Sequence, residues 1–445
     1  MNPPSRGEQQ KNLRSPFLCL LRRTLTLSAF VLCLLLSSPN LATRAQESGL
    51  RLSREERIKV FEHTWQAVNE NYYDKNFNGV DWRKVHATFL PQAEAARNNE
   101  EFYGVLRRML GELRDAHTRV YAPEDGFDRY HPSGTTVGLM VRRIEGQPVV
   151  VWVEAGSEAA QQGIRPGYVI TAIDNVPVEQ ALEHARDDSG DSSSLTARDL
   201  QSFNRLFQGP RETNVGVTFI DEEKKARTIN LLRRFVEMPR RVASRRLPGD
   251  IGYIELTGFA PEIERDFERA VQSLKDTRGL ILDLRNNGGG FVQTVEQVAS
   301  YFFVNETELG SFITRQGRAM HQRTQALRNV YRAPMIVLVS ARSASGAEML
   351  AAAMQETHRA IIIGANPTTC GCLLGVSRTL RLPDGGKLNI SDTDFRTARG
   401  RRIEAVGVQP DEKVEVRIAD LLAGRDRALE LATERFTSLL NAAAR

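Results

Sequence analysis

Two short polar stretches, each directly after an apolar run, contain the groups best suited to chemistry. One is Ser340–Leu350, a serine-rich stretch that follows the apolar run Met335–Val339. The other is Arg285–Gly290, which ends in three glycines and follows Leu280–Leu284. A serine hydroxyl becomes a nucleophile once a neighbouring base accepts its proton, and backbone N–H groups of glycines can stabilise an oxyanion. The two stretches therefore predict a nucleophile and an oxyanion hole.

Both apolar runs are typical of buried strands, and a helical pattern follows each polar turn. Parallel strands that alternate with helices end at the same edge of a sheet, so we expect the two turns to meet there. Simpler interpretations stay open. Ser345 and Glu348 also fit a helix capping box, and Gly288–Gly290 can simply form a turn. Asp283 and Arg285 are predicted to form a structural ion pair at the strand end.

The same two stretches resemble those of the C-terminal processing (tail-specific) serine peptidases. In that family a strand ending in Asp-Leu-Arg-Asn-Asn-x-Gly-Gly precedes a Ser-Ala-Ser-x-x-Glu stretch, and the resemblance covers most of this chain. It implies that Ser345 is the nucleophile, with Ser343 as the alternative. It also implies an oxyanion hole made by the N–H groups of Gly288 or Gly289 and of Gly346.

The base departs from the usual pattern of that family. Its members place a lysine in a Gly-x-x-x-x-Gly-Lys-Gly stretch, but the matching stretch here, Gly364–Gly371, has Cys370 at the lysine position. His117 instead matches the histidine of relatives that resemble the tricorn core protease, and Glu404 matches their acid. This resemblance implies that Ser345 attacks, His117 moves the proton and Glu404 orients the imidazole.

Several alternatives stay open for this site. His117 could be a helix-end residue that complements the helix dipole, and Glu404 could be an exposed strand acid. Because Cys370 replaces the lysine, the chain could also be a catalytically inactive peptide-binding scaffold of the same fold. A third alternative is a non-proteolytic hydrolase or ligand-binding protein, since a fold does not fix the chemistry performed on it.

Two cysteines lie near the predicted site, in the sequence Cys370-Gly-Cys372. They form neither a disulfide framework nor a zinc site, because no second pair of ligands accompanies them. The simplest prediction is two small, half-buried side chains. The alternative is redox control, in which thiol chemistry in an oxidising compartment regulates access to the nucleophile. The family resemblance implies catalysis without a metal or an organic cofactor.

The amino-terminal segment is predicted to be an export signal over residues 1–45. Arg22 and Arg23 precede the apolar run Leu25–Leu36, and small residues follow up to Ala45, where we expect cleavage. This predicts an exported protein of the bacterial periplasm or another extracytoplasmic space. An uncleaved segment would instead anchor it to a membrane. Residues 1–45 hold the whole formal charge of +5, so the remainder is neutral and the sequence predicts no nucleic-acid partner.

The rest of the 445-residue chain divides by its patterns. We expect a multidomain α/β protein with these parts: an N-terminal helical module (50–130), a PDZ-like β domain (133–235), a peptidase core of the crotonase-like ββα-spiral type (236–415) and a C-terminal helix (416–445). The helical module begins with a capping box at Ser53 and Glu56. A polar stretch, Arg186–Ser194, is predicted to be a surface insertion.

The PDZ resemblance rests on the loop Val137-Gly138-Leu139 and on the glycine-rich segment that ends at Tyr168. PDZ domains bind the carboxyl end of a peptide by adding it as a strand. The family usually has Asp at the position of Tyr168. The resemblance implies polypeptide substrates that are bound by their C-terminal ends, while the oligomeric state stays open.

Overall fold

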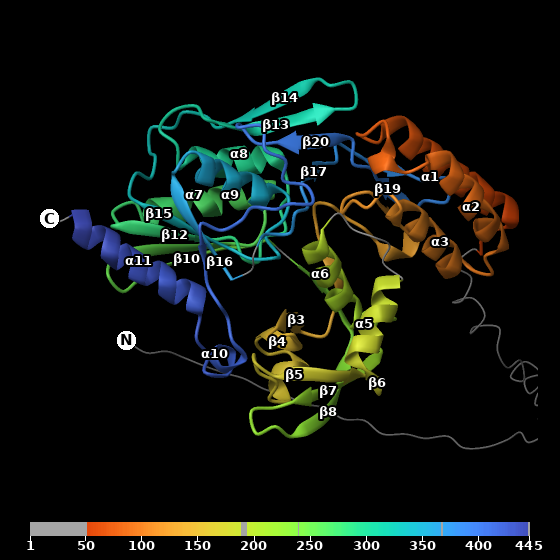
Figure 1. The fold of residues 1–445 in the computed structure, drawn as a ribbon, viewed down its shortest axis with the longest axis horizontal. Coiled ribbons are helices and arrows are strands. Elements are labelled where there is room, and N and C mark those ends of the chain that lie inside the picture. The colour runs from red at the N-terminus through yellow and green to blue at the C-terminus, as the bar shows by residue number, and fades with distance from the viewer. Residues whose placement is uncertain (1–50, 188–193, 239, 366–367, 444–445) are drawn as a thin grey trace, which may run out of the picture. The chain divides into compact units, whose positions relative to one another are not determined.

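The computed structural model describes residues 51–187, 194–238, 240–365 and 368–443 (Figure 1). Residues from Leu52 onward form one compact unit. The predicted export signal over 1–45 lies outside the described residues. Within the described ranges, no helix combines the length and the apolar character needed to cross a membrane.

The N-terminal module contains three helices, α1 (Arg54–Asn71), α2 (Trp82–Ala95) and α3 (Asn99–Gly111). The predicted capping box is confirmed, because Ser53 and Glu56 exchange side-chain hydrogen bonds with each other's backbone at the start of α1. A distant hairpin, β18 (Thr379–Arg381) and β19 (Lys387–Asn389), pairs with β1 (Arg119–Tyr121) beside these helices. Leu382 and Leu388 of this hairpin region are buried in the same hydrophobic cluster as the helices. The module is therefore completed by a hairpin that comes from within the core segment of the chain.

The PDZ-like module is an antiparallel sheet in the order β3-β4-β5-β7-β8, with β3 at one edge. Its elements are β3 (Leu139–Ile144), β4 (Gln147–Val153), α4 (Glu158–Gln161), β5 (Val169–Ile173), β6 (Val176–Pro177), α5 (Val178–Asp187), α6 (Leu195–Arg205), β7 (Asn214–Ile220) and β8 (Ala226–Leu232). A separate pair, β2 (Ser133–Thr136) and β9 (Arg234–Glu237), connects the sheet to the rest of the chain. Tyr168 is buried in the hydrophobic cluster of this module. This burial explains why an aromatic residue is accommodated at that position.

The polar stretch Arg186–Ser194 differs from the predicted surface insertion at both of its ends. Arg186 belongs to α5, and residues 188–193 lie outside the described part of the chain. Ser194 is buried, caps α6 and donates its hydroxyl hydrogen bond to the Cys370 carbonyl. The end of this stretch therefore makes a contact with the peptidase core.

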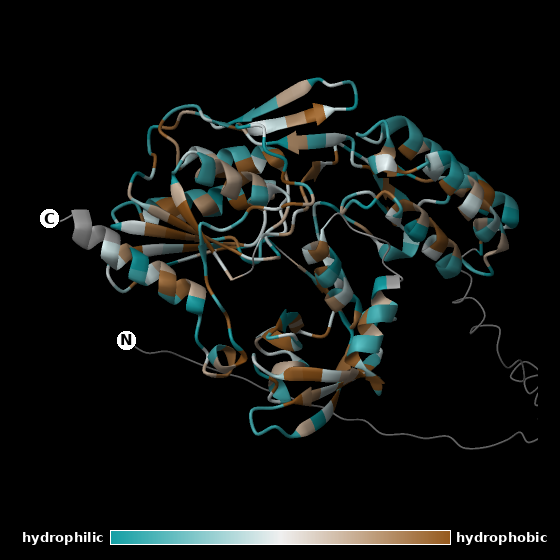
Figure 2. Ribbon diagram, in the orientation of Figure 1, coloured by the Kyte–Doolittle hydropathy of each residue, from teal (hydrophilic) through white to brown (hydrophobic). Residues whose placement is uncertain are grey.

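The core contains a six-stranded sheet in the order β10-β11-β12-β15-β16-β21. Every neighbouring pair from β11 to β21 is parallel, and β10 is antiparallel. The strands are β10 (Val242–Leu247), β11 (Ile251–Leu256), β12 (Gly279–Asp283), β15 (Met335–Val339), β16 (Ala360–Gly364) and β21 (Glu412–Lys413). Figure 2 shows the central strands as strongly hydrophobic, as expected for parallel strands buried on both faces. The parallel arrangement confirms the predicted α/β class.

The two faces of this sheet are covered by different helices. On one face, Leu280 and Leu282 pack with α7 (Glu264–Ser273), α8 (Val292–Ser300) and α9 (Gly346–Glu356), the first of which follows the short turn Pro261–Ile263. On the other face, Ile281 packs with residues of α11 (Arg427–Ala443), including Phe436. Because successive side chains of β12 point to opposite faces of the sheet, the strand packs against the helices on both faces. A four-stranded antiparallel sheet, in the order β14-β13-β20-β17, completes the core; its strands are β13 (Glu308–Thr314), β14 (Ala319–Arg323), β17 (Leu374–Gly375) and β20 (Thr393–Arg396).

The C-terminal segment differs from the single helix predicted from residue 416 onward. It forms α10 (Ile418–Leu422) and α11, with a break between them. Gly424 in the break has φ +67°, a conformation that ends helices and that glycine adopts without steric strain. Asp426 then accepts a hydrogen bond from the Leu429 N–H, which starts the second helix. Gly424 and Asp426 therefore mark the break between the two helices, and the continuous helical pattern of the sequence did not reveal it.

Candidate active site

Ser345 stands at the turn between β15 and α9, in a conformation that is unusual for a residue with a side chain. Its backbone has φ 53° and ψ −116°, which is strained for any residue other than glycine. Such strain is concentrated at functional sites, and a strained serine between a strand and a helix is the geometry of a nucleophile elbow. Glu348 accepts a hydrogen bond from the Ser345 N–H at 3.0 Å, whereas no side-chain hydrogen bond from Ser345 caps the helix. Helix capping thus accounts for Glu348 but not for the Ser345 hydroxyl.

Ser343, the alternative nucleophile, is committed to the structure of the loop. Its side chain is fully buried. Its hydroxyl donates to the Leu284 carbonyl at 2.8 Å and accepts from the Ser340 N–H at 3.0 Å. These bonds tie the nucleophile turn to the end of β12. Ser343 therefore supports the loop, and Ser345 is the better nucleophile.

The glycine turn after β12 lies directly against Ser345. A Cβ atom added to Gly289 would lie 2.7 Å from the Ser345 Cβ and 2.9 Å from the Gly346 nitrogen. Only a residue without a side chain permits this approach. The Gly289 N–H donates to Asn287 Oδ1 at 2.8 Å, whereas a Cβ on Gly288 would meet nothing within 4 Å. Gly288 therefore faces open space next to the nucleophile. Gly346 is the first residue of α9, and the N–H groups at the start of a helix have no acceptor within the helix.

The predicted ion pair at the end of β12 is confirmed. Asp283 and Arg285 are joined at 2.6 Å, and Arg285 also pairs with Asp426 at 2.7 Å. Tyr253 donates its hydroxyl hydrogen bond to Asp283 at 2.7 Å. The pair therefore connects the sheet edge to the start of α11 and has a structural role.

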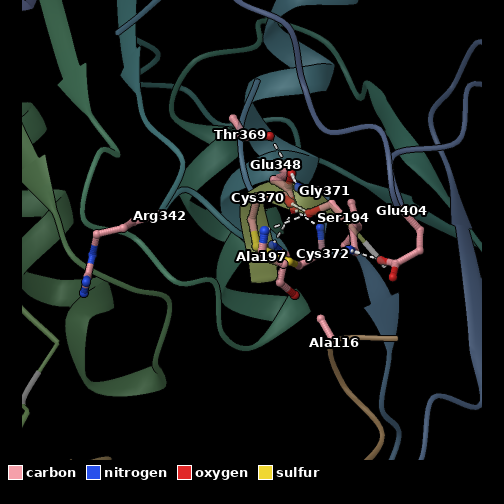
Figure 3. The surroundings of a disulfide bond; sticks show 12 residues. Ala116, Ser194, Ala197, Arg342, Glu348, Thr369, Cys370, Gly371, Cys372 and Glu404 are labelled. Atoms are coloured by element: carbon pink, nitrogen blue, oxygen red, sulfur yellow. Dashed lines mark hydrogen bonds between the residues drawn. A yellow bond between two sulfur atoms is a disulfide. The ribbon is translucent and has the colours of Figure 1, made fainter. Parts of the chain in front are cut away.

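Cys370 and Cys372 form a disulfide bond, which the sequence analysis did not predict (Figure 3). Both cysteines are buried, rather than half-buried as expected. The Cys372 carbonyl accepts from the Ser345 N–H at 3.0 Å, and the Cys370 N–H donates to the Ser343 carbonyl at 3.1 Å. The position of the family's lysine thus holds half of a disulfide, which has no group that takes up a proton at neutral pH.

The residues that precede His117 and Ser345 in the sequence both pack near the same disulfide. Ala116 and Ala344 both pack against the small cluster formed by Ala197, Cys370 and Cys372, and Figure 3 shows Ala116 close to the disulfide. Their neighbours in sequence are His117 and Ser345. The structure therefore brings the segment of the predicted base to the nucleophile turn, although one follows α3 and the other precedes α9.

The environment of His117 favours a neutral imidazole. Burial lowers its pKa to about 4; the charge of Asp115 acts in the opposite direction, and the charges of Arg119 and Arg129 lower the pKa further. Its Nδ1 atom is buried and has no hydrogen-bond partner in the described part of the chain. Since α3 ends at Gly111, six positions earlier, His117 is not the helix-end residue of the alternative interpretation. A neutral imidazole with an unused nitrogen can accept a proton.

Glu404 is buried, so its interpretation as an exposed strand acid is wrong. Its Oε2 atom accepts from the Leu373 N–H at 2.6 Å, and the next residue, Ala405, donates its N–H to the Gly371 carbonyl at 2.9 Å. The acid therefore lies beside the disulfide loop, as Figure 3 shows. The acid that acts on the pKa of His117 is Asp115, a residue that the sequence analysis did not single out.

Tyr73 connects the two acids and was also missed. Burial raises the pKa of Tyr73 to about 12; Arg402 lowers this pKa, whereas the charges of Asp394, Asp115 and Glu404 raise it further. Arg402 donates to the Tyr73 hydroxyl oxygen at 2.8 Å. Asp115, which follows the helical module, and Glu404, in the core, thus both raise the pKa of the Tyr73 hydroxyl. Nothing in the sequence just after α1 distinguishes this tyrosine from a core residue.

Glu348 is the centre of a hydrogen-bond network beneath the nucleophile. Its carboxylate is fully buried and accepts from the N–H groups of Ser345, Gly371 and Cys372 and from the Thr369 hydroxyl. Burial raises the pKa of Glu348 to about 7, although these hydrogen bonds act against the rise. Sequence reasoning treated Glu348 as a capping residue and as part of the family motif, because its other partners, Thr369, Gly371 and Cys372, lie more than twenty positions away.

The predicted peptide-binding loop of the PDZ-like module, Val137-Gly138-Leu139, leads into β3, which begins at Leu139. Gly138 has φ +75°, and a Cβ there would lie 2.6 Å from the Ser157 Cβ. Its N–H donates to Thr136 Oγ1 at 3.0 Å. The close packing explains the glycine. A peptide carboxylate at this loop would have to displace the Thr136 hydroxyl to bind the Gly138 N–H.

Two parts of the chain match known domain families. Residues 250–414 match peptidase family S41, and residues 53–111 match the tricorn protease C1 domain. The S41 range contains Ser345, the disulfide and Glu404, whereas His117 falls outside both ranges. The family match therefore bears on the core and the helices, and not on the base.

The chain is also similar to curated proteins and solved structures. A carboxyl-terminal-processing protease of Synechocystis sp. is 26% identical over 381 residues, 83% of each chain. The structure of a photosystem II D1 C-terminal processing protease is 27% identical, with a TM-score of 0.55 over 81% of this chain and 93% of that chain. Mature CPAF shares the fold, with 14% identity and a TM-score of 0.66 over 87% of this chain and 98% of that chain. The core of this chain is therefore similar to the serine-type peptidases of family S41, and its N-terminal helices are similar to the tricorn protease C1 domain.

Proposed function

We propose that this protein is an exported serine endopeptidase in which Ser345 is the nucleophile and His117 is the base. The observation that carries the proposal is the strained Ser345 turn at the edge of the parallel sheet, with the Gly289 backbone packed against it. A strained turn presents the hydroxyl outward, and the glycine contact leaves room for a substrate carbonyl.

The proposed reaction follows from the surroundings of these residues. His117, neutral because burial lowers its pKa, takes the hydroxyl proton as Ser345 Oγ attacks the peptide carbonyl. The resulting oxyanion is held by the N–H groups of Gly288 and Gly346. The imidazolium returns its proton to the leaving amine, and a water molecule then hydrolyses the acyl-enzyme by the reverse sequence.

Either of two acids can stabilise the imidazolium. Glu404 was predicted for this role, and its carboxylate lies beside the disulfide loop. Asp115 acts on the pKa of His117 directly, and its Oδ2 atom is buried without a hydrogen-bond partner among the described residues. Comparing Asp115→Asn with Glu404→Gln by kcat decides between them, since loss of the orienting acid lowers kcat by several orders of magnitude, about 10⁴-fold in a serine protease triad.

The substrates are proposed to be exported polypeptides that are bound near their C-terminal ends. Peptidase family S41 acts on polypeptides, and the relatives above are named as C-terminal processing enzymes. The Cys370–Cys372 disulfide supports an oxidising, extracytoplasmic location. Fractionation of cells that express the full chain tests the location, and the N-terminal sequence of the mature protein tests cleavage near Ala45.

The first experiment is cleavage of an unfolded protein by the purified mature chain, beside Ser345→Ala, His117→Ala and Ser343→Ala. We expect the first two variants to be inactive and Ser343→Ala to retain cleavage in proportion to its folded fraction, measured by circular dichroism. Loss of activity in Ser345→Ala alone would mean that another group is the base. Absence of cleavage by the wild-type chain would favour the peptide-binding scaffold, an alternative that the disulfide at the lysine position supports.

A further inference from the structure

Two arginines meet between the PDZ-like module and the nucleophile turn. Arg142 lies on the edge strand β3, and Arg342 precedes Ser345 by three residues. Both residues are half-buried. Burial lowers the pKa of Arg142 to about 9, and the charge of Arg342 lowers it further. The charge of Arg342 therefore acts on Arg142, in a region where burial lowers the pKa of both arginines.

Ser340 fixes the position of this pair. Its hydroxyl donates to the Arg285 carbonyl at 2.6 Å and accepts from the Arg342 N–H at 3.0 Å and from Arg142 Nη2 at 3.3 Å. Arg142 of the PDZ-like module is thus attached to the same turn that carries Arg342. Figure 3 shows the Arg342 side chain directed away from the disulfide.

Among the described residues, no carboxylate acts on the pKa of either guanidinium group. In the same ranges, Arg142 Nη1 and Arg342 Nε are buried without hydrogen-bond partners. Buried charges are normally paired, because an unpaired charge is expensive to desolvate. A like-charged pair with unused donors on the nucleophile turn is therefore the arrangement expected of an anion-binding site that is completed by its ligand.

We propose that Arg142 and Arg342 bind a carboxylate of the polypeptide substrate, next to the nucleophile and apart from the Val137–Leu139 loop. The proposal rests on the proposed peptidase function. Guanidinium groups bind carboxylates through two parallel hydrogen bonds. The carboxylate has two potential sources, the C-terminal α-carboxylate and an acidic side chain near the cleaved bond.

The position of Arg342 also sets the distance from this carboxylate to the cleaved bond. Arg342 precedes Ser345 by three positions, so their Cα atoms lie within about 11 Å of each other. An extended peptide covers that distance in about three to four residues. Cleavage should therefore occur a few residues from the bound carboxylate, and the contact would select both the substrate and the bond.

The test uses three fluorogenic peptides of one sequence: a free acid, its C-terminal amide, and an amide with Asp as the last residue. For the full mature chain we expect kcat/KM to be about 10- to 100-fold higher for a carboxylate peptide than for the plain amide, the value of a charge-assisted hydrogen-bond pair. A preference for the free acid alone identifies the α-carboxylate as the ligand. Equal preference for the Asp peptide identifies any nearby carboxylate.

The variants Arg142→Gln and Arg342→Gln should reduce this preference to about onefold, and Arg342→Lys should retain part of it. Arg143→Gln is the matched control, because Arg143 is the next residue on β3 and pairs with Glu179 at 2.9 Å instead. A wild-type chain that cleaves all three peptides equally would overturn the proposal, as would glutamine variants that keep the full preference or that lose all three substrates equally. If the wild-type chain cleaves none of the peptides and no unfolded protein, the proposed function itself fails.

Discussion

Ser345 and His117 lie in regions that are held in place by different kinds of contact. The Ser345 turn belongs to the parallel-sheet core, where Glu348 and the Cys372 carbonyl both accept its N–H. The His117 segment follows the helical module and is anchored by Asp115 and Thr118, which bond to Ser391. The proposed nucleophile is therefore positioned by the core itself. The proposed base is positioned by the packing of a separate module, and its Nδ1 atom has no hydrogen-bond partner among the described residues.

This difference suggests which changes abolish activity and which adjust it. Substitutions near Ser345 should disturb the closely packed hydrogen-bond network around Glu348, in which each N–H donor has an acceptor. Changes on the base side should alter the pKa and orientation of the imidazole while the fold is preserved.

The largest effect is expected from Gly289→Ala. The added methyl would lie 2.8 Å from the Ala344 carbonyl oxygen and 2.7 Å from the Ser345 Cβ, at a residue with φ +95°. Since displacing a reacting group by about 1 Å costs on the order of 10²-fold in rate, we expect kcat to fall at least that far. The control is Gly317→Ala, which has φ +84° but open space around it. Equal losses of activity in both variants would show that backbone strain, and not contact with Ser345, is responsible.

The next effect concerns the pH dependence of stability through Glu348. Burial raises its pKa from 4.5 to about 7, so between these values the folded protein binds more protons than the unfolded chain. Stability should therefore fall as the pH rises from about 4.5 to 7 and level off above it, by on the order of 3 kcal/mol. Urea unfolding at several pH values measures this slope. Glu348→Gln should remove the slope, and an unchanged slope in that variant would assign it to other groups.

The difference between the two regions also explains how much could be predicted from the sequence. The nucleophile side is local: an apolar strand, a polar turn and a helix lie in consecutive order, so Ser345 and the glycine turn were visible as motifs. The contacts that hold them are not local, because Glu348 bonds to Gly371 and Cys372 across more than twenty residues. The base side depends on Asp115 and Tyr73, whose significance arises only when the modules pack together. The disulfide was missed because two cysteines separated by one glycine fit no familiar framework.

A smaller effect is expected from opening the Cys370–Cys372 disulfide. The bond closes a loop of three residues, so the chain-entropy model gives a stabilisation of only about 1 to 2 kcal/mol. Glu348 holds the same loop by hydrogen bonds to the Gly371 and Cys372 N–H groups, which do not need the disulfide. We therefore expect the double variant Cys370→Ser/Cys372→Ser to fold and to retain activity within about tenfold of wild type. A complete loss of activity on reduction would instead support redox control of the site.

The smallest effect is expected on the base side, from Arg119→Gln and Arg129→Gln. Both arginines lower the pKa of His117, after the larger contribution of burial. Removing either charge should move the acidic limb of the kcat/KM profile, which lies near pH 4 in the wild-type chain, to higher pH by less than about one unit. Asp115→Asn should move it the other way, because the carboxylate charge favours the imidazolium. Shifts of opposite sign from these substitutions would identify His117 as the titrating base, since a change that merely loosened the module would lower kcat without moving the limb.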